Sequence, residues 1–112
     1  MKSISEMSLK DVQKIQAILF DLDGTFVSKS VMESEAYSRL EMLQNSGIKT
    51  IVVTGRPAGW CDMMARWWPI DAVIGENGAF FYKKVGKKIV REAYHSSDLL
   101  LEYQDKLKSL FE

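Results

Sequence analysis

The stretch AILFDLDGTF, residues 17–26, joins a run of apolar residues to two carboxylates, a glycine and a threonine. A short apolar run of this kind is typical of a buried strand, and the acidic and glycine residues after it mark its end. Asp21 and Asp23 are two residues apart, so both carboxylates lie on one side of the chain if the extended conformation continues. Such close carboxylates repel each other unless a cation lies between them or one is protonated. The stretch therefore predicts either a solvated turn or an active site.

Two further apolar runs end in a similar way. Residues 48–53, IKTIVV, run into Thr54 and Gly55, and residues 71–75, DAVIG, run into Glu76. Runs that are apolar almost throughout are expected for parallel strands covered on both faces. We therefore expect three parallel strands whose carboxyl ends meet at one edge of a sheet, where open α/β sheets bind their ligands.

Segments of helical length separate these runs. Residues 33–46 carry apolar side chains at helical spacing and stop before Gly47, a natural C-terminal cap. A second helix begins at Pro57 and ends before Pro69, and we expect its apolar stripe to pack in the core. The stripe consists of Trp60, Met63, Met64 and Trp67. This βαβαβ order predicts an α/β fold, a Rossmann-like three-layer α/β/α sandwich around a parallel sheet.

The pattern changes after the third strand. Residues 79–94 read as an added β-hairpin that turns through Val85 and Gly86. A last helix is predicted from a cap at Ser97, with an apolar face that includes Leu100, Tyr103, Leu107 and Leu110. A short leading helix is predicted to start at Ser8. We expect residues 1–112 to form a single domain.

Composition narrows the classes of function. The 15 Lys and Arg balance the 15 Asp and Glu, so no overall field favours nucleic acid or an anionic membrane, and we expect neither as a partner. A single cysteine, Cys61, excludes an intrachain disulfide and suits a reducing compartment. No signal-peptide core or membrane-length apolar run is present. These features predict a soluble, cytoplasmic protein.

The residues at the first two strand ends are suited to phosphate chemistry. A hard cation such as Mg²⁺ relieves the repulsion between Asp21 and Asp23 and also binds phosphate oxygens. Thr54 offers a hydroxyl, Gly55 an unobstructed amide, and Arg56 a bidentate partner for an oxyanion. The helix that begins near residue 57 directs its positive end toward the same place. Together these groups predict phosphoryl transfer.

The motifs ILFDLDGTF and IVVTGR resemble the first two motifs of the haloacid dehalogenase superfamily, and VIGENGAFFY is similar to the third-strand region of its large-cap, Cof-like or sugar-phosphatase-like members. The resemblance implies that Asp21 is the nucleophile and forms an aspartyl-phosphate. It implies that Asp23 acts as the acid and then the base. The Asp21 carboxylate and the Asp23 main-chain carbonyl would hold Mg²⁺, and Thr54 and Gly55 would hold the phosphoryl group.

The same resemblance implies supporting roles for other residues. Gly24 and Thr25 would shape the turn after the first strand, and Asn77 would lie near the substrate entrance. Glu76 either approaches the metal or caps a loop. The implied activity is Mg²⁺-dependent hydrolysis of a small phosphorylated metabolite, such as a sugar phosphate. The alternatives are a phosphotransferase or phosphomutase relative, and a non-catalytic remnant that acts as an assembly module.

The resemblance covers the N-terminal portion of such a hydrolase core, and residues from about 95 to 112 would begin a cap or linker helix. In the family, a later lysine and one or two later acidic residues complete the site, and further strands flank the first strand. We therefore expect weak activity or none from residues 1–112 alone. We also expect the first strand to be an exposed edge that favours self-association.

Overall fold

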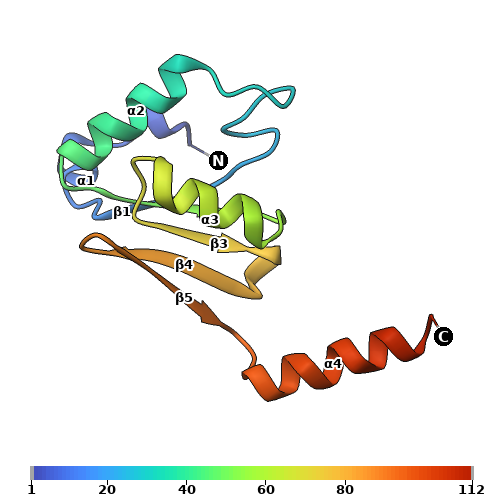
Figure 1. Ribbon diagram of the computed structural model, residues 1–112. Coiled ribbons are helices and arrows are strands. Elements are labelled where there is room, and N and C mark those ends of the chain that lie inside the picture. The colour runs from blue at the N-terminus through green and yellow to red at the C-terminus, as the bar shows by residue number, and fades with distance from the viewer. Residues whose placement is uncertain (1, 112) are drawn as a thin grey trace.

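The computed structural model describes residues 2–111 (Figure 1). One sheet contains β1 (Ala17–Asp21), β2 (Lys49–Val53), β3 (Ala72–Gly75), β4 (Phe80–Val85) and β5 (Lys88–Ala93). The longer helices are α2 (Ser34–Asn45), α3 (Ala58–Trp67) and α4 (Ser97–Ser109). The shorter ones are η1 (Ile4–Glu6), α1 (Leu9–Val12) and η2 (Glu76–Gly78). These bounds lie close to the predicted ranges, and the helix predicted to start at Ser8 is α1, for which Ser8 is the N-cap.

The strands follow the order β1-β2-β3-β4-β5 across the sheet. The first three are parallel, with Asp21 opposite Val53 and Val53 opposite Ile74. The hairpin of β4 and β5 extends the sheet in antiparallel fashion. The predicted α/β class and Rossmann-like order are confirmed. Within the described residues β1 pairs with β2 alone, so it is the edge strand that the family resemblance predicted.

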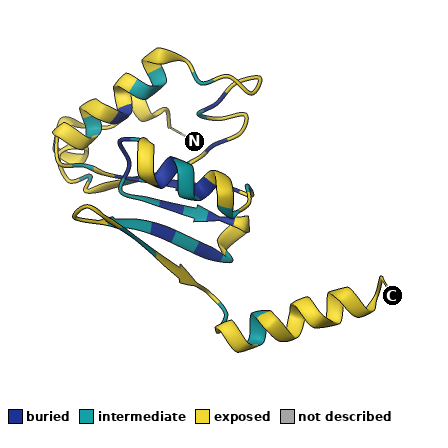
Figure 2. Ribbon diagram, in the orientation of Figure 1, coloured by how far each residue is buried: buried dark blue, intermediate teal, exposed yellow. Residues whose placement is uncertain are grey.

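One face of the sheet carries the core. Helix α2 packs on β2, and α3 packs on β3 and β4. Val52 and Val73 lie on this face and are fully buried, together with Leu40 of α2 and Met64 of α3. Figure 2 shows buried and more exposed positions alternating along the strands. Both helices lie on this face because the two right-handed crossovers advance across the sheet in the same direction.

The opposite face carries no helix among residues 2–111. Its apolar side chains are at least partly exposed, and they include Leu19, Ile51, Val53, Ile74 and Phe81. We call these five residues the open face. Apolar strands covered on both faces were expected, but the described residues provide the sheet and one of the two predicted helix layers. Two crossovers of the same hand and direction cannot supply a helix to each face.

Helix α3 buries a different stripe from the predicted one. Its buried residues are Cys61, Met64 and Ala65, whereas Trp60 is 50% exposed and Trp67 is 76% exposed. The expected core role was therefore wrong for these two tryptophans. A helix turns by about 100° per residue, so the face that contains residues 61, 64 and 65 leaves positions 60 and 67 on its flanks. Both tryptophan side chains therefore lie at the surface of the molecule.

Helix α4 extends away from the sheet (Figure 1). Ser96, one residue before the predicted cap, accepts a hydrogen bond from the Leu99 N–H. The helix is confirmed, but none of its residues is buried, and Leu110 on its predicted apolar face is 77% exposed. Its apolar face therefore has no fully packed partner within the described part of the chain.

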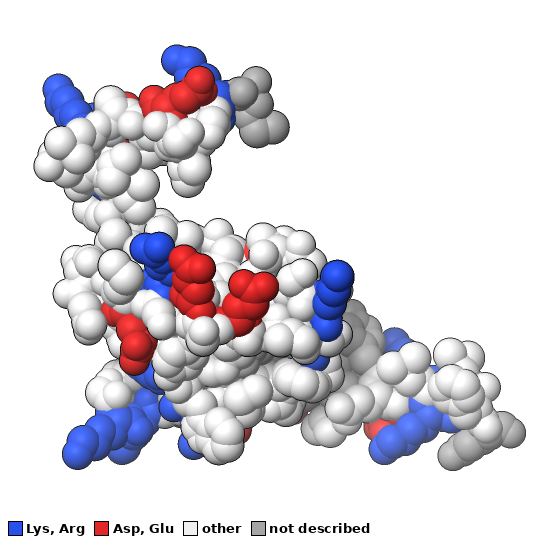
Figure 3. Space-filling model, turned by 90° about the horizontal axis from the view of Figure 1, so that it is seen from above, with Lys and Arg blue, Asp and Glu red and all other residues white. Residues whose placement is uncertain are grey.

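Charges of both signs lie side by side on the face seen in Figure 3, in keeping with a net charge of zero. None of the helices between residues 2 and 111 has the length and apolar character needed to cross a membrane.

Candidate active site

Asp21 is the last residue of β1 and lies at the carboxyl edge of the sheet. Its carboxylate is exposed and accepts a hydrogen bond from the Thr25 hydroxyl, with 3.3 Å between Oγ1 and Oδ2. Asp21 lies opposite Val53, the residue immediately before Thr54 and Gly55. The structure therefore places the predicted nucleophile beside the predicted phosphate loop, at the edge where parallel sheets bind ligands.

The turn after β1 keeps both aspartates at the surface. Leu22, which lies between them, is 3% exposed and belongs to the core. Its carbonyl accepts hydrogen bonds from the N–H groups of Phe26 and Val27, at 3.0 and 2.8 Å. Gly24 has a φ of +77°, a left-handed conformation that residues with side chains rarely adopt. This turn therefore anchors Leu22 inside and presents the carboxylates outside.

The loop after β2 packs closely against the loop after β3. Thr54 is buried, and its hydroxyl accepts a hydrogen bond from the Arg56 N–H at 3.1 Å, a contact that does not use the hydroxyl proton. The Asn77 N–H donates to the Thr54 carbonyl at 3.2 Å. A β-carbon on Gly55 would lie 3.1 Å from Asn77 Oδ1, so Gly55 allows this close approach. Asn77 thus supports the predicted phosphate loop.

Glu76 and Asn77 both have positive φ angles, of 45° and 56°. The Glu76 N–H donates to the Arg56 carbonyl at 3.1 Å, which joins the two loops. No group of three or more His, Cys, Asp or Glu placed to hold a metal occurs within the described ranges. The main-chain N–H of Glu76 thus joins the two loops, and both predicted roles of its side chain stay predictions.

Arg56 forms a bidentate ion pair with Asp23 through two nitrogens of its guanidinium. Nε donates to Oδ2 at 2.8 Å, and Nη2 donates to Oδ1. The guanidinium also lies over the Trp60 ring, 4.2 Å from its centroid. Arg56 was predicted to bind phosphate, and its pair with Asp23 was not predicted, because the partners are 33 residues apart. The one available signal was that Asp23 and Arg56 lie two and three residues after the ends of neighbouring strands.

The ion pair changes the acid–base state of Asp23. Hydrogen bonds from Arg56 hold the pKa of the Asp23 carboxyl below its ordinary value of 3.8, and the same contacts raise the pKa of Arg56. Asp23 is therefore ionised at neutral pH, which is the form that can accept a proton. Before it could donate a proton, the pair with Arg56 would have to open.

Arg56→Gln is expected to raise the pKa of Asp23 toward its ordinary value, because the charged hydrogen bonds are lost. The native pair stabilises the fold above the unfolded-state pKa of Asp23, and this contribution disappears as the pH falls through the lower folded-state pKa. NMR titration of the carboxyl carbon measures the shift. Arg66→Gln is the matched control, since Arg66 forms a similar pair with Asp62. An unchanged Asp23 titration in Arg56→Gln would contradict the pairing.

The donor set at β1 is suited to Mg²⁺. The exposed Asp21 carboxylate and the Asp23 main-chain carbonyl both offer oxygen, the ligand atom that Mg²⁺ prefers. Mg²⁺ usually keeps several waters and takes few protein ligands together with substrate phosphate. The residues present therefore fit the ion as part of its coordination shell.

Three solved structures that are named for the haloacid dehalogenase superfamily have folds similar to that of this chain. A haloacid dehalogenase-like hydrolase from B. subtilis has 28% identity, covers 84% of this chain and 33% of its own, and gives a TM-score of 0.57. Two proteins from Bacteroides thetaiotaomicron, a superfamily phosphatase and a haloacid dehalogenase-like hydrolase, give TM-scores of 0.60 and 0.62 at 24% and 20% identity. They cover 95% and 86% of this chain, and 40% and 38% of their own. Below 25% identity the likeness shows the fold alone.

The chain thus spans two fifths or less of the length of these solved proteins. No curated protein matches it. The family model described as haloacid dehalogenase-like hydrolase matches residues 18–111, which include both aspartates and both loops of the candidate site. On this match and the sheet topology, the chain belongs to the haloacid dehalogenase-like hydrolases.

Proposed function

We propose that this chain carries the nucleophile and the phosphate loop of a Mg²⁺-dependent phosphatase that acts on a small phosphorylated metabolite. The supporting observation is the register of β1 and β2, which sets Asp21 beside the loop that begins at Thr54. An exposed carboxylate at this edge is accessible to a phosphorus atom. The Thr54 hydroxyl and the Gly55 amide can then bind the phosphate oxygens.

In the first step, an oxygen of the Asp21 carboxylate attacks phosphorus and the bond between phosphorus and the leaving oxygen breaks. Asp23, in its protonated form, gives its proton to that oxygen, so the leaving group departs as an alcohol. The product on the chain is an aspartyl-phosphate on Asp21. Arg56 has to release Asp23 for this step, because their pair favours the ionised carboxylate.

In the second step, water attacks the phosphorus of the aspartyl-phosphate and the bond to the Asp21 oxygen breaks. The ionised Asp23 takes the proton of that water, which restores the starting state and releases inorganic phosphate. When bound, Mg²⁺ would supply the positive charge that offsets the carboxylate and phosphate charges as they approach. The Thr54 hydroxyl and Gly55 amide would stabilise the oxygens of the transferring group.

Mg²⁺ together with beryllium fluoride, a mimic of the aspartyl-phosphate, is expected to raise the melting temperature of this chain. A ligand at about ten times its Kd stabilises the native state by about 1.4 kcal/mol, or roughly 6 °C for a domain of this size. Asp21→Asn should lose the shift, because the acceptor carboxylate is gone. Asp105→Asn makes the same chemical change on the exposed surface of α4 and should keep it. No shift in the wild-type chain would favour the non-catalytic alternative.

A further inference from the structure

A recess of about 330 Å³ lies between α3 and the loop of residues 22–32 that follows β1. Six of its lining side chains are apolar: Leu22, Val27, Met32, Trp60, Met64 and Trp68. Arg56 and Ser30 complete the lining. The proposed chemistry uses none of the apolar residues. The volume lies at the lower end of the range for small-molecule sites, which are also mostly apolar with a few polar groups.

Both tryptophan walls are held in place by neighbours. The Arg56 guanidinium lies over the Trp60 ring, 4.2 Å from its centroid. The Trp68 ring is 6.4 Å from Phe26, which is itself 4.8 Å from Phe20 of β1. Such contacts restrict the rotamers of both indoles before a ligand arrives. Preorganised aromatic walls favour binding of a flat apolar group, because less conformational entropy is lost.

The loop that covers the recess also has a defined shape. Ser28 and Val31 exchange two main-chain hydrogen bonds, of 3.2 and 2.8 Å. Lys29 and Ser30 between them have φ angles of 49° and 61°, as in a tight two-residue turn. This turn positions Ser30 and the neighbouring Met32 at the recess. The recess is therefore bounded by two ordered elements.

The recess adjoins the acid–base residue of the proposed mechanism. Leu22 lines it and directly precedes Asp23, and Arg56 lines it while binding the Asp23 carboxylate. In that mechanism the leaving oxygen takes its proton from Asp23, so the leaving group has to lie on this side of the site. The apolar recess is thus next to the part of the substrate that departs.

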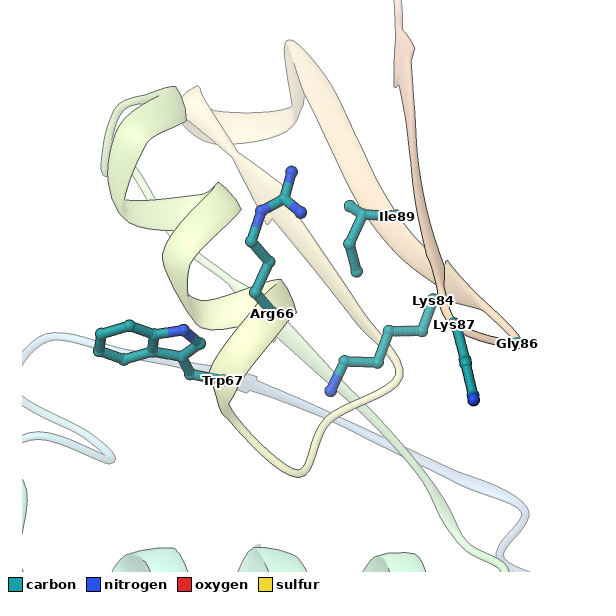
Figure 4. A pocket seen from close by; sticks show the side chains of 6 residues that line it. All are labelled: Arg66, Trp67, Lys84, Gly86, Lys87 and Ile89. Atoms are coloured by element: carbon teal, nitrogen blue, oxygen red, sulfur yellow. The ribbon is translucent and has the colours of Figure 1, made fainter.

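A larger recess of about 530 Å³, shown in Figure 4, is not lined by Arg56 or Leu22, the residues next to the Asp23 carboxylate. It lies at the β4–β5 turn and the end of α3, and its lining includes Arg66, Lys84 and Lys87. Arg66 is paired with Asp62, and Lys84 donates to the Trp68 carbonyl at 2.6 Å. Two of its three cations are therefore already engaged, and none lies at the catalytic edge.

We propose that the recess beside Asp23 binds the leaving group of the substrate and selects a planar apolar group, such as an aromatic ring. This inference rests on the proposed function, because the leaving group is defined by the attack of Asp21. It makes Trp60 and Trp68 specificity-determining residues that recognise the substrate through its apolar part and not through phosphate.

Phenol, a neutral probe, tests the recess apart from phosphate chemistry. The chain has three tryptophans, so its ¹⁵N NMR spectrum offers three indole N–H signals. Phenol should shift the signals of Trp60 and Trp68 in a saturable manner. The signal of Trp67 should not change, because Trp67 does not line this recess. Trp60→Ala should weaken the phenol affinity read at Trp68 by about fivefold or more, whereas Trp67→Ala should not. Equal shifts of all three signals would overturn the inference.

Phosphonates, which resist hydrolysis, connect the recess to the catalytic edge. In the presence of Mg²⁺, phenylphosphonate should bind at least about fivefold tighter than methylphosphonate, and Trp60→Ala should remove this preference. Equal binding of both phosphonates would overturn the recess inference and support the proposed function. If phenol binds but neither phosphonate does, the proposed function is overturned. Binding of a planar apolar group in the recess is then still supported.

Discussion

Gly75→Val is expected to lower the stability of the fold by about 3 kcal/mol or more, at the upper end of what overpacking costs. Gly75 is the last residue of β3 and lies on the face of the sheet that α3 covers. A β-carbon there would lie 2.5 Å from Phe80 Cε2 and 2.7 Å from Cys61 Sγ. Both neighbours are buried, so neither can move aside without disturbing the core. Urea unfolding followed by far-UV circular dichroism measures the loss.

Gly59→Ala is the matched control for this substitution. Gly59 lies in α3, and nothing within 4 Å obstructs a β-carbon there. Alanine favours a helix interior over glycine by up to about 1 kcal/mol, so this variant should be slightly more stable than the wild type. A Gly75→Val protein as stable as the wild type would show that α3 does not pack on the end of β3.

Leu19→Lys is expected to convert a self-associating chain into a monomer. We propose that two copies associate through β1, the edge strand of the described sheet. Residues 17–21 contain no Lys or Pro, which commonly protect such edges from pairing with another chain. Leu19 is 59% exposed on β1 and belongs to the open face, so a second copy would bury apolar surface as well as main-chain groups. A lysine at this position adds charge to the contact.

Leu101→Lys is the control, because Leu101 is also 59% exposed but lies on α4. Light scattering coupled to size exclusion should report a mass above that of the monomer for wild type and Leu101→Lys, and a monomer for Leu19→Lys. The reverse pattern would indicate that α4 mediates association. A monodisperse wild-type monomer at high micromolar concentration would contradict the proposal.

Local sequence signals were sufficient for most of the secondary structure. Gly47, with a φ of +80°, directly follows the cap of α2, and α3 begins directly after Pro57, because caps and turns depend on adjacent residues. The motifs after β1, β2 and β3 predicted which loops would meet. The stripe of α3 was predicted less well, since hydrophobic spacing alone did not distinguish a buried tryptophan from one on the flank.

The edge position of β1 was predicted from the family resemblance. Residue order alone was enough to predict the βαβαβ unit and the approach of Asp21 to the loop at Thr54. These features follow from hydrophobic runs, turn residues and the handedness of crossovers, which are local or general. Only the folded chain decides that Asp23 pairs with Arg56, and that Trp60 and Trp68 line a recess beside that pair. The physical reason is that side-chain partners across 33 residues are selected by how two loops and a helix pack. No periodicity in the sequence encodes that packing.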